Sequence, residues 1–466
     1  MTAAAPNAPH QTNLDWVKRN LFPNWWSGVI TVVMLPLSIY AAYRGLRFLF
    51  VTGQWDAVRV NLTLFMQGTF PRDEQWRLIS QIVVFALAFG IGAGTNSAAT
   101  HDRAQDAGLD VAEGSIAGTL ARMWSLVAFI ALLLVFASTD DVGSLINPFL
   151  VVGGAIFAAF IGFQAHRLPR RFRNVGWVLT MTFLVLGFQI VSGFDAGGWV
   201  PLSIVYGSVA FGAVPVDRFD AAWVRVLLRL VALAIVAFVI RAIYAAVDSP
   251  GIGWDVWSGL HLTLMVSAIA IVLAFPLGLL LALARRSTLP ALRIMASTYI
   301  EVIRGVPLIT LLFMGQFILG FVVPQGTVLS AITRAIAVMT LFSAAYIAEI
   351  VRGGLQALPK GQTEAGQAMG LAPPTIMRRI VLPQALTAVI PAMVGQFIAL
   401  FKDSSLLSII AVLEFLGVRK IIHAQEAFRS VGIAETLIFV AIGYWAFAFA
   451  MSRESQRLER RLRVTR

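Results

Sequence analysis

The stretch Glu349–Pro383, EIVRGGLQALPKGQTEAGQAMGLAPPTIMRRIVLP, is the longest polar, charged segment in the C-terminal half of the chain, and apolar segments flank it on both sides. Gly370 lies where the C-terminal cap of a short helix is expected. The pair Pro373-Pro374 then prevents simple continuation, and Pro383 suits the first turn of the next helix. We therefore predict a short helix folded outside the lipid, which another surface approaches closely. The alternative is a loop that only joins two membrane helices.

The composition predicts an all-α polytopic membrane protein. Hydrophobic residues make up 58% of the 466 residues and charged residues 13%, whereas soluble domains carry about 25% charged residues. A transmembrane helix needs roughly 20 apolar residues. We predict twelve such runs, at 29–51, 78–95, 121–138, 148–165, 176–193, 199–216 (the weakest), 224–246, 260–283, 297–320, 329–350, 383–401 and 433–451.

Basic residues in short loops predict the orientation, because cytoplasmic loops are enriched in lysine and arginine. By this rule the polar stretch, the loop with Arg285 and Arg293, and the tail 453–466 face the cytoplasm. The same rule explains the net charge of +12, which therefore does not call for a nucleic-acid partner. The two halves join correctly only with an odd number of spans before residue 255, so the run 199–216 is predicted to cross. The alternative is an interfacial segment.

A segment rich in Gly, Pro and Trp indicates the boundary between two multi-span halves. The predicted order is a cytoplasmic N-terminal segment at 1–28, six or seven additional helices at 29–246, the boundary at 247–258, a five-span domain at 259–452 with its polar loop at 351–382, and a basic cytoplasmic tail at 453–466.

Charged residues in or beside membrane spans are functional candidates, because a charge in lipid is energetically costly. Glu301 and Arg304 are spaced i, i+3 in YIEVIRGVPL, on one helix face and close enough to pair. Glu349 and Arg352 repeat this arrangement at the end of the next apolar run. These four residues are candidates for a gate or a substrate contact. The alternative is two helix-end ion pairs that fix adjacent spans.

A second candidate is Lys402-Asp403-Ser404-Ser405, which interrupts an apolar stretch with no obvious turn. Non-helical backbone is tolerated at membrane depth only where protein or water covers it. We therefore predict a discontinuous helix that lines a polar path; the alternative is a simple extracellular loop. Kinks are predicted at the prolines inside apolar runs, which are Pro276, Pro307 and Pro391.

Several kinds of catalytic and metal site are missing from the sequence. There is no cysteine, so disulfides, thiolate-bound zinc and iron–sulfur clusters are excluded, and the five histidines are scattered. A phosphate-binding P-loop needs Gly-Lys-Ser/Thr, but glycine precedes none of the lysines, which are Lys18, Lys360, Lys402 and Lys420. No Gly-x-Ser-x-Gly elbow and no HExxH pattern occurs. We expect a conduit that binds no metal, and not an enzyme.

The spacing within the polar stretch resembles the EAA loop of permease subunits of binding-protein-dependent ABC importers. The match rests on Glu364, Ala365, Gly370, Ile380, Leu382 and Pro383. The glutamate and the glycine are six residues apart, and nine residues separate the glycine from the isoleucine. The departure is Gly366, where the family usually has a second alanine. Both residues are small, so close packing survives at some cost in helix propensity.

Other segments resemble the polar amino-acid branch of this family. They are GLHLTL (259–264), YIEVIRGVPLITLLF (299–313), AAYIAEIVRGGLQALPKGQTEA (344–365) and FKDSSL (401–406). The resemblance covers roughly residues 255–455. The long N-terminal half, with FPRDEQWR (70–77), and the ending MSRESQRLERRL are similar to the membrane subunit of general L-amino-acid importers, although with fewer motifs.

The resemblance implies a permease subunit of an ATP-driven L-amino-acid importer in the bacterial inner membrane, with a type I importer core of five helices. It implies four kinds of partner besides the lipid bilayer: a second homologous permease, two cytoplasmic ABC ATPases that bind the ATP, and a periplasmic amino-acid-binding protein. The chain itself then needs no cofactor. The residues implied to couple it to the ATPase are Lys360, Gly361, Glu364, Ala365, Gly370, Leu371, Ile380, Leu382 and Pro383.

Two other classes of protein compete with this interpretation. A secondary transporter driven by an ion gradient predicts broken helices in two inverted halves and buried acidic ion ligands, but the recognisable motifs here are confined to the second half. A membrane-embedded enzyme needs a clustered nucleophile or metal set, and the sequence shows none.

Overall fold

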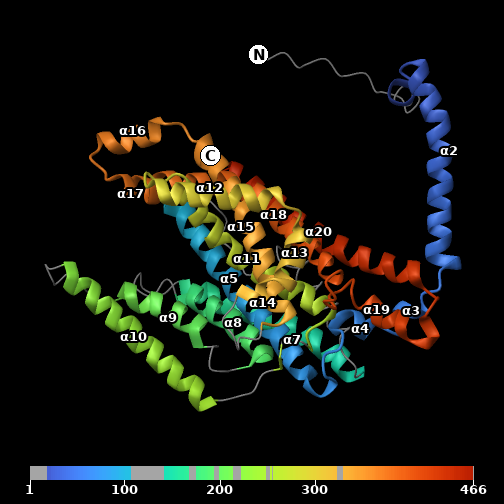
Figure 1. Ribbon diagram of the computed structural model, residues 1–466, viewed down its shortest axis with the longest axis horizontal. Helices are drawn as coiled ribbons and strands as arrows, with labels where there is room; N and C mark the ends of the chain where they lie inside the picture. Colours follow the sequence, from blue (N-terminus) through green and yellow to red (C-terminus); the bar gives the residue numbers. More distant parts are fainter. Residues whose placement is uncertain are drawn as a thin grey trace.

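The computed structural model describes residues 18–106, 141–166, 175–193, 199–213, 222–247, 252–253, 256–322 and 329–464 (Figure 1). Within these ranges the named elements are all helices, and the β pairing there is one isolated bridge between Gly259 and Glu414. The predicted all-α class is confirmed. The described residues include eight helices long and apolar enough to cross a membrane, or nine if a bent pair counts as one span.

The twelve predicted runs correspond to these nine candidates and three further segments. The run 148–165 holds the shorter apolar helix Phe149–Gln164, and the run 199–216 holds Trp199–Phe211. The run 121–138 lies outside the described residues. Since a span needs roughly 20 residues, the crossing by 199–216 and the total of twelve stay predictions.

The five predicted runs of the C-terminal half form the bundle that carries the polar stretch. Its helices are α11 (Gly259–Arg285), the pair α12 (Pro290–Gly305) and α13 (Leu308–Phe317) followed by α14 (Leu319–Val322), α15 (Ala331–Ala357), α18 (Leu382–Asp403) and α20 (Ile433–Val464). Helices α11, α15 and α18 contact one another, and α20 packs against α18 (Figure 1). This is the five-helix core that the sequence predicted.

The run 297–320 was predicted as a single span, but the structure breaks it between α12 and α13, whose axes differ by 105°. Val306 is extended, with φ −107° and ψ 134°, because the ring of a following proline disfavours the helical region for the residue before it. The kink predicted at Pro307 is thus a full break. Pro276 and Pro391 lie inside the unbroken helices α11 and α18.

Small residues let α11 and α15 pack closely at the centre of the bundle. A Cβ atom on Gly278 would lie 2.7 Å from Cβ of Ile347 and 2.8 Å from the carbonyl oxygen of Ala344. Ala274 and Ala348 are fully buried beside this contact. The two helix backbones therefore approach through small side chains, as interfaces between membrane helices commonly do.

The N-terminal half adds helices beside this bundle. They are α2 (Trp25–Arg47) with its continuation η1 (Phe48–Thr52), α5 (Gln75–Asp106), α7 (Asp141–His166), α8 (Val175–Ser192), α9 (Trp199–Ala213) and α10 (Ala222–Val247). Helices α5 and α7 touch backbone to backbone, because a Cβ on Gly94 would lie 2.0 Å from the carbonyl oxygen of Ala159. Helix α2 buries no residue and stands apart from the other helices (Figure 1).

A short segment of the N-terminal half packs on the C-terminal bundle. This N-terminal strap, residues 54–70, contains α3 (Asp56–Arg59) and α4 (Leu62–Gln67). The ring of Phe65 contacts those of Phe415 and Phe439, with centroid distances of 5.9 and 4.9 Å. The backbone N–H of Gln54 donates to Glu435 at 2.7 Å. The strap thus ties the N-terminal half to the end of the bundle opposite the polar stretch (Figure 1).

Candidate functional site

The polar stretch folds as the predicted short helix, α16 (Gly361–Ala368), between α15 and α18 (Figure 1). Gly370 has a φ of +74°, which an L side chain rarely adopts. Its N–H donates to the carbonyl of Gln367 at 2.9 Å, and the N–H of Leu371 donates to that of Gly366 at 3.1 Å. These two bonds form a Schellman cap, so the predicted C-terminal cap at Gly370 is confirmed.

The helix after the loop begins earlier than predicted. Helix α17 (Pro373–Ile376) starts at the proline pair, because proline at the first helical position loses no hydrogen bond. The chain continues through a π-helical turn, η6 (Met377–Val381), into α18. Pro383 is the second residue of α18, so its predicted place in the first turn of the next helix is confirmed, with the π-helical turn directly before it.

The residues expected to couple to an ATPase divide into two groups in the structure. Lys360, Gly361, Glu364, Ala365, Gly370 and Pro383 are exposed, whereas Leu371, Ile380 and Leu382 pack against the apolar cluster that contains Ile376, Val381 and Leu355. Gly366 is the buried residue of α16. The first group is open to solvent, and the second group anchors the loop to the bundle.

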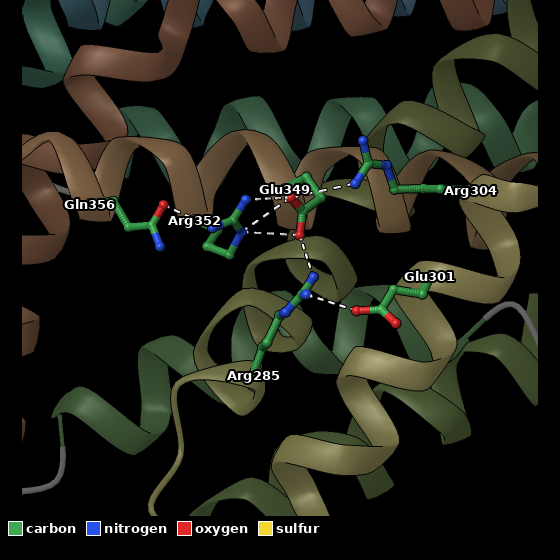
Figure 2. Close-up of polar contacts among 6 residues, drawn as sticks. All are labelled: Arg285, Glu301, Arg304, Glu349, Arg352 and Gln356. Carbon is green, nitrogen blue, oxygen red and sulfur yellow. Dashed lines mark hydrogen bonds and ion pairs between the residues drawn. The ribbon is translucent and has the colours of Figure 1, made fainter.

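The charged candidates near the loop meet around one carboxylate, that of Glu349 on α15 (Figure 2). Glu349 pairs with Arg285 at the end of α11 at 2.5 Å, with Arg352 one turn further along α15 at 2.8 Å, and with Arg304 near the end of α12 at 3.4 Å. Arg285 also pairs with Glu301 at 3.0 Å. We call these five residues the ion-pair cluster; they join three helices.

One predicted pair is wrong and one is right. Glu349 and Arg352 do pair, as their i, i+3 spacing predicted. Glu301 and Arg304 do not pair with each other among the described contacts, because Glu301 faces Arg285 and Arg304 reaches Glu349. Arg304 also lies over the ring of Tyr346, 5.4 Å from its centroid. Arg304 is thus a residue of α12 whose side chain contacts α15.

The burial of the cluster makes these ion pairs stronger than ordinary surface pairs. The side chain of Glu349 is 15% exposed, and that of Arg285 is 24% exposed. A partly buried carboxylate needs several donors to replace lost water, and Arg352 alone donates to both Glu349 oxygens, from Nε to Oε1 and from Nη2 to Oε2. Three guanidinium groups face two carboxylates, so the cluster stays positive and suits the cytoplasmic edge of a membrane.

The predicted interruption after Lys402 is present. Helix α18 ends at Asp403 and passes into the 3-10 turn Ser404–Ser408. The hydroxyl of Ser404 donates to the carbonyl of Phe401 at 2.6 Å, and Ser404 is fully buried. Lys402 is exposed and Asp403 half-buried, while Ser405 supplies its carbonyl to Ser408 at 2.8 Å.

The structure does not bring this interruption to the ion-pair cluster. Helix α18 rises from the polar loop, and its 22 residues span about 33 Å. Asp403 therefore lies near the end of the bundle opposite the loop, whereas Glu349 lies near the loop. The candidates form two sites and not one.

Glu414 was missed at the sequence level, although its position in the apolar segment SLLSIIAVLEFLGV is a usable signal, because a lone acid among apolar residues needs partners. It is fully buried and accepts bonds from the N–H groups of Leu416 and Gly417, each at 2.7 Å, and from the hydroxyl of Tyr444 at 2.8 Å. Burial raises the pKa of this carboxyl group to about 7. The network holds the segment after the interruption against α20.

One protein-family match covers the part of the chain that contains all of these candidate sites. Residues 274–464 match the family described as "Binding-protein-dependent transport system inner membrane component". This region contains the polar loop, the ion-pair cluster and the interruption after Lys402.

Curated relatives extend the match. The chain is 45% identical over 210 residues to the inner membrane amino-acid ABC transporter permease protein YhdY of Escherichia coli (strain K12), covering 45% of this chain and 57% of YhdY. It is 39% identical over 323 residues to the glutamate/glutamine/aspartate/asparagine transport system permease protein BztC of Rhodobacter capsulatus, covering 66% of this chain and 73% of BztC. The second alignment is longer than the C-terminal half and so extends into the N-terminal half.

A solved structure titled "Crystal structure of an amino acid ABC transporter with histidines" is also similar. The identity is 32% and the TM-score 0.40, with 44% of this chain and 92% of that chain covered.

Proposed function

Because the chain belongs to the family of inner membrane components of binding-protein-dependent transport systems, we propose that it is the permease subunit of an ATP-driven importer of L-amino acids. It is a multi-pass inner membrane protein by this membership and by the eight candidate spans among its described residues. The alignments cover 57% of YhdY and 73% of BztC, whose names specify amino acids. L-Amino acids are therefore the proposed substrate class.

The observation that carries the proposal is the exposed, capped helix α16. All its residues except Gly366 are exposed, and Leu371 and Ile380 hold its base against the apolar cluster. A rigidly held helix with small exposed residues suits docking into a groove of a partner. We propose that this partner is a cytoplasmic ABC ATPase, which binds and hydrolyses the ATP, because no lysine of this chain follows a glycine.

The ion-pair cluster supplies a route from α16 to the spans. Arg352 and Glu349 lie on α15, whose end leads directly into the polar loop. The same carboxylate binds Arg285 of α11 and Arg304 of α12. A displacement of α16 is thereby passed to three helices as a rigid-body shift, which ATP-driven closure of an ATPase pair biases toward one of two states.

Lys402 and Asp403 are proposed to line the translocation path at the opposite end. An amino acid carries both charges, and this end of α18 offers an ammonium group and a carboxyl group on successive residues. In the described contacts neither side chain forms an ion pair with protein. Both groups are thus available for a zwitterionic substrate.

A complete importer needs further subunits. We propose a second homologous permease, two ATPases and a periplasmic amino-acid-binding protein as partners in the lipid bilayer. Family membership favours this assembly over a secondary transporter driven by an ion gradient.

Uptake into proteoliposomes tests the proposal. We expect amino-acid uptake only when the ATPase, the binding protein and ATP are all present, with no effect of collapsing proton and sodium gradients. Uptake by the permease alone along an ion gradient would contradict the proposal and support a secondary transporter.

A further inference from the structure

The one buried residue of α16, Gly366, lies directly against the side chain of Ile376 on α17. A Cβ atom on Gly366 would be 2.9 Å from Cγ1 of Ile376, 3.1 Å from Cδ1 and 3.3 Å from Cγ2. Contacts below 3.0 Å essentially never occur for real Cβ atoms. The isoleucine therefore occupies the space that a methyl group on residue 366 would need.

Ile376 cannot easily give way. It is 2% exposed and belongs to the apolar cluster with Leu355, Val381 and Ala385, which come from α15, η6 and α18. A closely packed core transmits a displacement instead of absorbing it. A larger residue at position 366 must consequently move α16 itself.

The chain between the two residues is also short and constrained. The Schellman cap fixes the end of α16 through the bond from Leu371 to Gly366. A second link joins α16 to α18, because the Gln384 side chain donates to that of Gln362 at 3.4 Å. The contact between Gly366 and Ile376 is thus the apolar contact that fixes the orientation of α16 against α17.

We propose that Gly366 and Ile376 are positioning residues, which together set the angle at which α16 is presented to its partner. The side chain of Ile376 fills the space between α16 and α17 that a side chain at position 366 would otherwise occupy. This accounts for the glycine at the position where the EAA pattern departs from its usual alanine. The inference rests on the proposed function only for the identity of the partner; the geometric part concerns this chain alone.

The geometric part is tested on the permease in lipid nanodiscs, without any partner. Because the chain has no cysteine, spin labels are placed uniquely on Thr363→Cys in α16 and Ala291→Cys in α12, both exposed. We expect Gly366→Ala to shift the main label-to-label distance. The double variant Gly366→Ala/Ile376→Ala should return it toward the wild-type value, because the methyl group then has room.

A matched control is Gly353→Ala, in α15, where nothing lies within 4 Å of an added Cβ. Its distance distribution should equal that of the wild type. An unchanged distance in Gly366→Ala would overturn the proposal. The proposal would also be overturned if the double variant showed the same shift in label-to-label distance as Gly366→Ala. In that case the side chain of Ile376 would not be what displaces α16.

The functional part is measured as ATP hydrolysed per amino acid imported in the assembled importer. We expect Gly366→Ala to raise this ratio roughly fivefold or more, in the range of typical coupling between sites, and the double variant to lower it again. A ratio equal to that of the wild type in Gly366→Ala would overturn this part. Absence of ATP-dependent uptake by the wild type itself would instead contradict the proposed function. The spin-label distances would then still decide whether Gly366 and Ile376 set the angle of α16.

Discussion

The carboxylate of Glu349 accepts a hydrogen bond from Arg285 at 2.5 Å, although 64 residues separate the two in the sequence. Through this contact the last residue of α11 is bound to α15 two turns before α15 ends. Arg304 and Arg352 share the same carboxylate. The loss of the Glu349 side chain would therefore remove three ion pairs together, two of which join α15 to other helices.

Glu349→Gln should impair both stability and transport. The neutral amide leaves three guanidinium groups beside one another with a single remaining carboxylate, that of Glu301. Loss of charge-assisted bonds at a partly buried site should cost about 2 kcal/mol of unfolding free energy. We expect uptake to fall by at least about tenfold. Denaturant unfolding and proteoliposome uptake measure the two effects.

Glu301→Gln is the matched comparison for the cluster. Its side chain is 67% exposed and makes one ion pair, so its removal should cost less than about 1 kcal/mol. An equal loss in both variants would show that Glu349 has no special position in the cluster.

Gly370→Ala should weaken the coupling loop through its backbone alone. The φ of +74° is strained for alanine by roughly 1–2 kcal/mol, while no atom lies within 4 Å of the new Cβ. We expect a frayed end of α16 and reduced co-purification of the ATPase, with normal insertion of the permease. Glu364→Lys should weaken co-purification by charge reversal on the exposed face. Normal uptake in both variants would remove the coupling role of α16.

Lys402→Ala and Asp403→Asn should separate transport from assembly. Neither side chain forms an ion pair among the described residues, so little folding energy should be lost. We expect uptake to drop by about tenfold while the ATPase still co-purifies. Loss of the ATPase complex in either variant would indicate a structural role for the interruption.

Glu414 predicts a pH dependence of stability. Its pKa is raised by burial from 4.5 to about 7, so the folded state holds a proton that the unfolded state has released in this range. The stabilisation is full below pH 4.5 and is lost as the pH rises through about 7, in total roughly 3 kcal/mol. Thermal unfolding between pH 4.5 and 7.5 should show this slope. Glu414→Gln should flatten this pH dependence of stability. An equal slope in that variant would show that another titrating group causes the pH dependence.

Local rules explain why the polar loop was predictable. Gly370 and the pair Pro373-Pro374 act through their own backbone geometry, and the structure places a cap and a helix start at these residues. Pro383 lies in the first turn of α18, as predicted, but the π turn before it, η6, was not predicted because no residue type specifies such a turn.

Contacts between distant segments were not predictable in this way. The i, i+3 spacing suggested that Glu301 pairs with Arg304, but Arg304 reaches Glu349 instead, because α12 packs against α15. The partners of Glu414 come from its own loop and from Tyr444 of α20, a spatial arrangement that depends on the packed bundle. Even the N-terminal strap carried no motif that pointed to its contact with Phe415.

Phe65→Ala should therefore reveal what the N-terminal strap contributes. Phe65 is fully buried and is surrounded by Phe415 and Phe439, which belong to the segment after the interruption and to α20. Removing a buried phenylalanine side chain typically costs about 3–5 kcal/mol. We expect lower thermal stability and faster amide hydrogen exchange at residues 409–432, while exchange in α16 stays unchanged. Phe50→Ala, at an 81% exposed position of η1, is the control and should change neither. Equal exchange at residues 409–432 in Phe65→Ala and the wild type would show that the strap does not hold this segment, because the loss of its main apolar anchor would then be without local effect.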